Sequence, residues 1–375
     1  MGSNRHLNPA ALAAAIRFAD YSEVASPDEE QVIRQLAEVN KTIVKKVFDD
    51  SGHAERAVHA KSHALLNGEL KVFPDLPAEL KQGVFSIPRE YQAVVRISSI
   101  AGDLLSDSVS LPRGFSIKLY DVAGERLPGS EDTRTQDFLM VSGTVFATGD
   151  MKAFLRDLKL LAATTDRAAW AKSALSTVLR PVTRAFVKAG IATGNLPSFG
   201  GFPESNPLGE RFGTQAAQRF GDYMAKLDLV PGSDNFKALT GHEFELRGRE
   251  NAVRDEIASV LRKEGGAWIL RAQLCRNLAA NPVDDPSIEW PEDSNPYLPI
   301  ARLEVKAQEG WSMERSRRVD DEMSFSPWHG IVAHQPLGVI GRVRKYVYPT
   351  LMAYRGALNG CPIHELAEPP DLAAP

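Results

Sequence analysis

The chain has 375 residues, of which 43% are apolar and 25% charged, and its formal net charge is −4. It is long enough to bury a large core, and its nearly balanced charge gives no general attraction for nucleic acid. Two cysteines exclude a disulfide framework or a thiolate metal site, which favours a reducing compartment. The first residues make a poor secretory signal and no apolar run approaches ~18 residues, so we expect a cytoplasmic protein.

The N-terminal part of the chain predicts one long helix and then several strands. Pro27, followed by two acidic residues, is typical of a helix start, and apolar residues keep helical spacing through residue 48. The following residues predict a short extended piece at 58–60, a strand running to residue 72, and further strands over 91–99, 113–121 and 137–146.

The middle of the chain changes to a helical period. Apolar residues at this spacing extend from residue 150 to about residue 194, and the part over about 168–190 carries lysines and arginines opposite its apolar face. A basic amphipathic helix can lie on a membrane surface or pack on a core with its basic face in water. We favour packing on the core and leave the membrane surface open. Residues 195–213 are rich in glycine, proline and serine and predict a long loop.

Strand signals return in the C-terminal half. Strands are predicted over residues 222–230, 242–248, 267–275 and 299–307, with a helix over 250–263. Because strands dominate and long excursions join them, we expect an α+β fold with an antiparallel β-barrel core, rather than a βαβ fold. The expected organisation is an N-terminal helical segment over 1–49, one large domain over 50–357 with a helical insertion at about 151–194, and a tail over 358–375.

A C-terminal helix is predicted over residues 341–355. Arg344, Tyr348 and Arg355 lie at i, i+4 and i+11, close to one face. An arginine one turn before a tyrosine favours the phenolate, the form that binds a metal, although tyrosine otherwise titrates near pH ~10. A surface helix with scattered arginines and aromatic residues is the other interpretation, and this stretch alone leaves both open.

His59 is the other candidate for chemistry. A single histidine among apolar residues is either a structural group or a catalytic one, and its neighbour His63 brings no convincing third ligand for zinc. The chain has no GxSxG elbow, no P-loop and no GxGxxG after a strand.

Six stretches occur in the order in which haem catalases have them. RAVHAK at 56–61 resembles RVVHAKG, VRISSIAG at 95–102 resembles VRFSTVAG, and LPRGFSIK at 111–118 resembles DPRGFAVK. The series continues with EWP at 289–291 and YLPI at 297–300, then FSP at 325–327, then R-x-x-x-Y at 344–348 with Arg355. Over about residues 50–356 the chain therefore resembles the catalase-like haem superfamily, and in its shortness the compact catalase-related subgroup.

This resemblance implies haem b bound between the barrel and the C-terminal helix. Tyr348 would be the tyrosinate ligand of the iron, kept ionised by the charge and hydrogen bonding of Arg344. His59 would be the acid–base group on the distal side, oriented by Ser98. The other implied cofactor contacts are the propionate-pairing arginines Arg56, Arg96 and Arg355 and the side chains Val58, Phe146 and Phe154.

One departure from the family pattern concerns the distal side. Catalases carry an asparagine in a GNNTPVFF stretch, and the ungapped register sets Val141 and Ser142 against the two asparagines, with Thr144 in place of the proline. The amide that helps to orient peroxide is thus absent or reduced to the hydroxyl of Ser142. We therefore expect haem binding but inefficient dismutation of hydrogen peroxide.

The function implied by the resemblance is that of a cytoplasmic haem oxidoreductase of the catalase or peroxidase type, in the setting of oxidative stress. Its substrate would be hydrogen peroxide or an organic hydroperoxide, with no nucleic-acid partner and with assembly as a homo-oligomer. Two alternatives stay open. One is an allene-oxide-synthase-like or hydroperoxide-lyase-like conversion of fatty-acid hydroperoxides, and the other is a non-catalytic haem-binding sensor or carrier.

Overall fold

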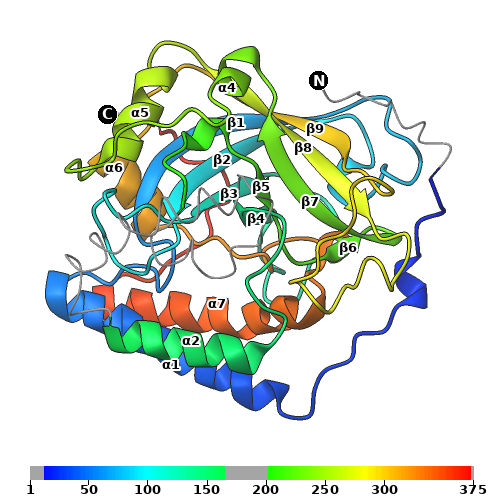
Figure 1. Cartoon of the computed structure of the whole chain (residues 1–375), viewed down its shortest axis with the longest axis horizontal. Helices are drawn as coiled ribbons and strands as arrows, with labels where there is room; N and C mark the ends of the chain where they lie inside the picture. Colours follow the sequence, from blue (N-terminus) through cyan, green and yellow to red (C-terminus); the bar gives the residue numbers. More distant parts are fainter. Residues whose placement is uncertain (1–11, 165–201, 373–375) are drawn as a thin grey trace.

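The computed structural model describes residues 12–164 and 202–372 (Figure 1). The expected basic helix over about 168–190 therefore lies outside the described residues. Of the expected insertion at 151–194, the structure describes only its first part, the helix α2 (Met151–Thr164).

An antiparallel β-barrel forms the centre of the described part of the chain. The strands are β1 (Ser62–Val72), β2 (Glu90–Ser99), β3 (Arg113–Leu119), β4 (Gln136–Ser142), β5 (Phe212–Gly213), β6 (Gln218–Phe220), β7 (Tyr223–Pro231), β8 (Gly266–Leu274) and β9 (Leu298–Val305). Their order in the sheet is β5-β4-β3-β2-β1-β9-β8-β7-β6, and a further pairing of β5 with β7 closes the sheet into a barrel. The expected α+β fold with an antiparallel barrel is confirmed.

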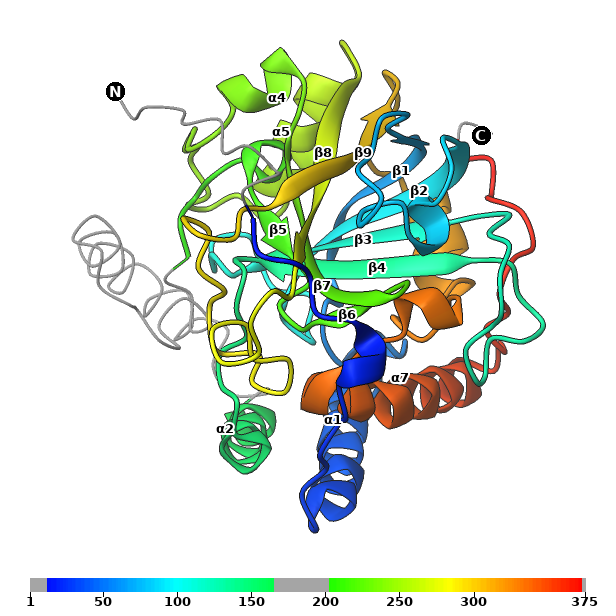
Figure 2. The same cartoon turned by 90° about the vertical axis from the view of Figure 1, so that its right-hand side faces the viewer.

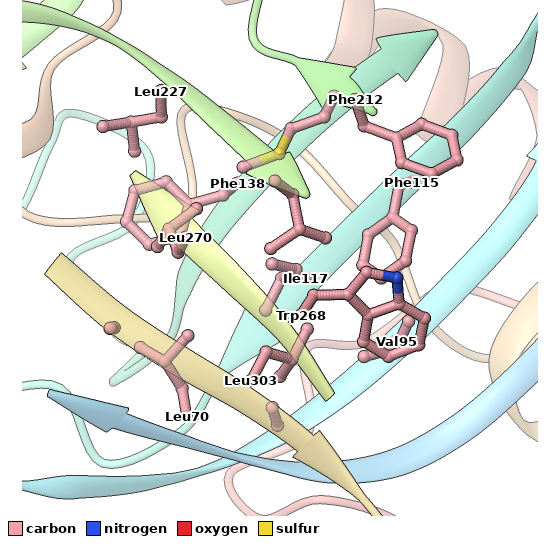
Figure 3. Close-up of a cluster of buried hydrophobic side chains, with 14 of the residues drawn as sticks. Leu70, Val95, Phe115, Ile117, Phe138, Phe212, Leu227, Trp268, Leu270 and Leu303 are labelled. Carbon is pink, nitrogen blue, oxygen red and sulfur yellow. The ribbon is translucent and has the colours of Figure 1, made fainter. Parts of the chain in front are cut away.

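Alternation along the strands fills the barrel with apolar side chains. On β3, Phe115 and Ile117 are fully buried in the main core cluster, as period-2 alternation of β-branched and aromatic residues predicts. Figure 3 shows these two side chains among residues from β7, β8 and β9. The rings of Phe115 and Trp268 meet edge to face, with centroids 5.0 Å apart.

Three helices form a layer along one side of the barrel (Figures 1 and 2). They are α1 (Glu29–Ser51), α2 and α7 (Gly338–Asn359), and their apolar faces share one cluster that includes Leu36, Leu155 and Val343. The other described helices are α4 (Asp234–Ala238), α5 (Ala252–Leu261) and α6 (Met313–Ser316), with a π-helical turn at Arg317–Asp321. Among the described helices, none has the length and apolar character needed to cross a bilayer.

The helix α7 carries the predicted R-x-x-x-Y pattern and is longer than the sequence indicated. Gly338, with φ of 70°, begins it, and Gly360 in the left-handed conformation ends it. Pro349 lies inside the helix, directly after Tyr348. Since proline has no N–H, the carbonyl of Lys345 loses its usual partner four residues on.

Two predicted strands are wrong and one ends early. Residues 58–60 are not extended, because His59 has φ of +58° and turns the chain. Residues 242–248 form only one isolated bridge, between Ser205 and Glu243, because their neighbours in space are a loop and not a strand with a free edge. The predicted strand over 137–146 ends at Ser142, because Gly143, with φ of 93°, forms only an isolated bridge with Phe212 and the chain bends after it.

Candidate functional site

A cavity of about 840 Å³ lies between the barrel and the helical layer. His59, Val141 and Ser142 contribute to its wall from the barrel side, and Arg344 and Tyr348 contribute from α7. Of the residues expected at the site, the cavity wall contains Arg56, Val58, His59, Arg96, Ser142, Phe146, Phe154, Arg344, Tyr348 and Arg355. Ser98 lies behind this wall, in contact with His59.

Backbone contacts fix the position of His59. Its N–H donates to the carbonyl of Ile100 at 3.1 Å, and its imidazole Nδ1 lies 3.1 Å from Ser98 Oγ. The ring also rests against β3 at Gly114, where a Cβ would lie 2.5 Å from two ring atoms. Only glycine leaves room there, so the β3 backbone and Ser98 together hold the imidazole at the cavity wall.

The surroundings of His59 keep its imidazole neutral. Burial is the largest cause, and the nearby Arg96, Arg344 and Arg56 add to it, so the pKa of His59 falls from 6.5 to about 3. A neutral imidazole has one N–H donor and one acceptor nitrogen. His59 can therefore accept a proton from a bound molecule at neutral pH.

On the opposite side, Arg344 and Tyr348 lie one helical turn apart on α7, and both are half-buried. In the described part of the chain neither side chain has a hydrogen bond or an ion pair, and none joins the two. The spacing places the two side chains on one face of the helix, and the hydrogen bond implied for the haem-bound protein stays a prediction. Both polar groups are free to meet a bound molecule.

The three remaining arginines converge on one buried acidic residue, Asp320. Arg56 and Arg96 pair with Asp320 Oδ1 at 3.2 and 2.7 Å, and Arg355 donates to the carbonyl of the same residue. Ser62 Oγ also donates to Asp320, at 2.7 Å. Burial alone would raise the pKa of Asp320, but the two paired arginines and this hydrogen bond bring its pKa below its ordinary value.

This cluster places three guanidinium groups at one end of the cavity. Their charges act on Asp320 and, at Arg355, on Asp321 and Glu55 as well, and burial, as the largest cause, raises the pKa of Glu55. The arrangement suits a ligand with carboxylates, because buried charge requires a partner. Arg96 Nη2 also donates to the carbonyls of His59 and Ala60. Arg56 makes the most hydrogen bonds of the three, because its Nη2 also donates to the carbonyls of Val319 and Met323.

Ser142, at the end of β4, has polar partners behind the wall. Its Oγ accepts from the N–H of Arg113 at 3.1 Å and lies 3.2 Å from both the Arg113 carbonyl oxygen and Glu210 Oε2. Arg113 in turn forms a buried ion pair with Glu210.

Much of the remaining wall is apolar. The rings of Phe146 and Phe154 meet edge to face with centroids 5.2 Å apart, and Leu36, Val44 and Leu158 extend this surface on α1 and α2. A large apolar molecule with a few polar groups matches this combination of surfaces.

Sequence reasoning missed Asp320, Glu210 and Gln215. Gln215 lines the cavity in a left-handed conformation, with φ of +60°, and His59 is another of the three non-glycine residues with positive φ in the described part of the chain. Asp320 lies in the π-helical turn, a feature frequent at functional sites, but no spacing in the sequence indicates it. Glu210 lies in a stretch that the composition predicted only as loop.

Three solved structures that share this architecture are catalases. A fungal catalase matches 93% of this chain and 68% of its own with a TM-score of 0.58 at 17% identity. Catalase A from Saccharomyces cerevisiae gives 93% and 70% with a TM-score of 0.58 at 16% identity, and a bacterial catalase gives 96% and 71% with 0.57 at 15%. No protein-family model matches the chain. The chain thus has the catalase fold.

Proposed function

We propose that the cavity binds haem b and that the protein is a haem-dependent oxidoreductase that processes peroxides, as a member of the compact catalase-related subgroup. One observation carries the proposal. A single cavity on the catalase fold is lined by a neutral imidazole on one side, by a phenol with an arginine one turn away on the other, and by an arginine cluster. This is the donor set that a tyrosinate-ligated haem requires.

The residues present fit such a group. Tyr348, unpartnered among the described residues, would hold the iron, and Arg344 would favour its phenolate form by charge. Arg56, Arg96 and Arg355 would pair the propionates, with Asp320 orienting the guanidinium groups. When bound, haem supplies the redox chemistry that cleaves the O–O bond of a peroxide.

The role proposed for His59 follows from its neutral state. Its imidazole would accept the proton of a bound peroxide and return it to the departing oxygen. Ser98 would keep the ring at the wall through Nδ1, at 3.1 Å, so that the other nitrogen is directed to the substrate. The substrates we propose are hydrogen peroxide and organic hydroperoxides.

A second candidate function is the conversion of apolar hydroperoxides, such as those of fatty acids, without an external reductant. The observation that favours it is the apolar wall on α1 and α2, formed by Leu36, Val44 and Leu158. Consumption of a lipid hydroperoxide in the absence of a reductant supports this function. Oxygen evolution from hydrogen peroxide, or peroxide reduction with a donor, supports the first.

The decisive experiment is the absorption spectrum of the protein loaded with haem, for wild type and for Tyr348→Phe. We expect wild type to bind haem with a phenolate-type high-spin spectrum, and we expect the variant to lose most haem or to change its spectrum. Tyr346→Phe is the matched control, because Tyr346 lies on the same helix but is exposed. An unchanged phenolate spectrum in Tyr348→Phe would refute the ligand, and haem uptake with no peroxide reaction would indicate a haem carrier or sensor.

A further inference from the structure

A buried ion pair between Arg113 and Glu210 lies next to Ser142, behind the part of the cavity wall (here the distal wall) that His59, Val141 and Ser142 form on the barrel side. The side chains of Arg113 and Glu210 are 2% and 9% exposed. Ser142 lies between this pair and the cavity, since its Oγ is 3.2 Å from Glu210 Oε2 and the residue itself lines the cavity.

The contacts of Ser142 Oγ fix the direction of its hydrogen. The backbone N–H of Arg113 donates to Ser142 Oγ at 3.1 Å. Two acceptors, the backbone carbonyl oxygen of Arg113 and Glu210 Oε2, each lie 3.2 Å from the same Oγ. A hydroxyl has one hydrogen, so acceptors this close repel Oγ unless the hydrogen points toward one of them. Because hydrogen bonds to ionised acceptors are the stronger ones, the carboxylate of Glu210 is the preferred partner.

We propose that Glu210 is a positioning residue that makes Ser142 a hydrogen-bond acceptor, and not a donor, toward the cavity. The hydrogen of Ser142 points to Glu210, and the N–H of Arg113 occupies one lone pair, so the second lone pair of Oγ remains for the cavity. At this point the wall therefore offers an acceptor for the O–H of hydrogen peroxide that His59 would not take. The inference rests on the proposed function and reverses the polarity that an amide donor would give this wall.

Two variants remove the acceptor in different ways. Ser142→Ala deletes the hydroxyl. In Glu210→Gln the new amide has to orient, because the Oε1 side of the carboxylate faces two donors, Arg113 Nη1 and Ser205 Oγ, the latter at 2.8 Å. The glutamine oxygen takes that side and the amide nitrogen faces Ser142 and donates to its Oγ. The hydrogen of Ser142 then turns to the Arg113 carbonyl oxygen or to the cavity, and in both arrangements no lone pair of Oγ remains for the cavity.

The affinity for fluoride shows whether Ser142 presents a hydrogen-bond acceptor or a donor to the cavity. Fluoride is an anion that binds ferric haem, and a neighbouring acceptor repels it whereas a neighbouring donor attracts it. Haem-loaded wild type and variants are titrated with sodium fluoride at one pH and ionic strength and followed by visible absorption. We expect Ser142→Ala and Glu210→Gln to bind fluoride about threefold to tenfold more tightly than wild type, the scale of one neutral hydrogen bond.

Ser205→Ala is the matched control, because Ser205 contacts the same carboxylate only at Oε1. It should bind fluoride as wild type does. Weaker fluoride binding by Ser142→Ala would identify a donor and overturn the proposal, whether or not Glu210→Gln folds. Tighter binding by Ser142→Ala together with wild-type binding by Glu210→Gln would assign the hydrogen to the Arg113 carbonyl and overturn the role of Glu210.

Failure of the proposed function gives a different result. If wild type takes up no haem, the haem proposal fails and a denaturation cycle on the haem-free protein tests Glu210. Ser142→Ala, Glu210→Ala and the double variant are unfolded with urea. A coupling of about threefold to tenfold in the unfolding constant supports the Ser142–Glu210 hydrogen bond, and additive effects overturn it.

Discussion

His59 combines features that are separately uncommon and that together suit acid–base work. Its backbone is left-handed, with φ of +58°, a conformation that costs a non-glycine residue energy unless its surroundings hold it. Those surroundings are the carbonyl of Ile100, Ser98 Oγ and the open space at Gly114. Because burial and three arginines lower its pKa to about 3, the imidazole stays a proton acceptor over the whole physiological range.

Replacement of this imidazole tests its role. We expect His59→Ala to retain haem and to react with stoichiometric peroxide about 10²-fold more slowly, the usual scale for a positioned proton-transfer group. Stopped-flow absorption measures the rate. His63→Ala is the control, since His63 is a buried neighbour that contacts Ser99 Oγ at 2.6 Å. If the rate falls strongly in His63→Ala but not in His59→Ala, the acid–base group is His63 and the role proposed for His59 is wrong.

Val141 and Ser142, which the sequence resemblance sets against the asparagines of catalases, line the cavity. Dismutation needs a second hydrogen peroxide held in a narrow site, and losing one preorganised donor costs on the order of 3 kcal/mol, or about a hundredfold in rate. We therefore expect wild type to evolve oxygen about a hundredfold more slowly than ordinary catalases, with organic hydroperoxide turnover less affected. Val141→Asn and Ser142→Asn should raise oxygen evolution.

Both reactions are measured side by side, by an oxygen electrode and by loss of the organic hydroperoxide. If wild type already evolves oxygen as fast as ordinary catalases, the missing amide has no consequence. If an asparagine raises both reactions equally, it acts on peroxide binding in general and not on the second peroxide.

At the scale of elements, strand β3 contacts the two polar residues, His59 and Ser142, that line the barrel side of the cavity. The backbone N–H of Arg113, the first residue of β3, donates to Ser142 Oγ. The imidazole of His59 packs against Gly114, the second residue. Gly114→Ala would place a methyl group 2.5 Å from the ring, so either the imidazole or the strand has to shift. We expect a stability loss of about 1–3 kcal/mol and a slower reaction with peroxide while haem still binds.

Urea denaturation and stopped-flow measurements follow these two effects. Gly310→Ala is the control, because a Cβ there would meet its nearest atom at 3.5 Å, an ordinary contact distance. A Gly114→Ala variant with wild-type stability and rate would show that the imidazole has more freedom than the structure gives it.

Period and composition were sufficient to predict most of the elements. The alternation around Phe115 predicted β3, and helical spacing predicted α1, α5 and α7. The segment 242–248 has strand-like residues but no strand edge to pair with, which only the folded arrangement decides. The turn at His59 was equally hidden, because its cause is the pair of carbonyls in residues 100–101, about forty residues away.

The site residues also fall into two groups, those that could be predicted from the sequence and those that could not. His59, Tyr348 and the arginines lie within short motifs, and the structure brings them to one cavity. Asp320 and Glu210 act through contacts that span long stretches of sequence, such as the 224 residues between Arg96 and Asp320. No local pattern contains such a contact, so these two carboxylates could be found only from the fold.

At the scale of the whole molecule, the three-helix layer lies along one side of the closed barrel (Figure 1). Residues of both the barrel and this layer line the cavity. The barrel supplies His59 and Ser142 from rigid strands and their connections, and the long helix α7 supplies Arg344, Tyr348 and Arg355. Positioning of facing groups on separate rigid layers suits a large flat ligand held between them. Assembly as a homo-oligomer stays a prediction, which sedimentation velocity would test.

Buried histidines also determine how the whole molecule responds to acid. The pKa values of His59 and His334 fall from 6.5 to about 3, in both cases chiefly through burial. Below pH about 6.5 the unfolded chain binds protons at these residues, whereas the native protein leaves them neutral until about pH 3. The free energy of unfolding therefore decreases as the pH falls through this window, by about 1.4 kcal/mol per pH unit for each histidine.

His334→Gln separates this effect from other acid-sensitive groups. His334 lies among Phe85, Phe138 and Phe220, and its Nε2 accepts from the N–H of Val84 at 3.0 Å, a contact that a glutamine oxygen can replace. Urea unfolding of both proteins is measured between pH 7 and pH 4, in the same haem state. The difference in the free energy of unfolding at pH 7 gives the packing cost of the substitution. The dependence of this free energy on pH gives the contribution of proton binding at residue 334. We expect the variant to lose about 1.4 kcal/mol less per pH unit than wild type. Equal slopes would mean that His334 is protonated in the native protein and that its aromatic surroundings do not exclude the charge.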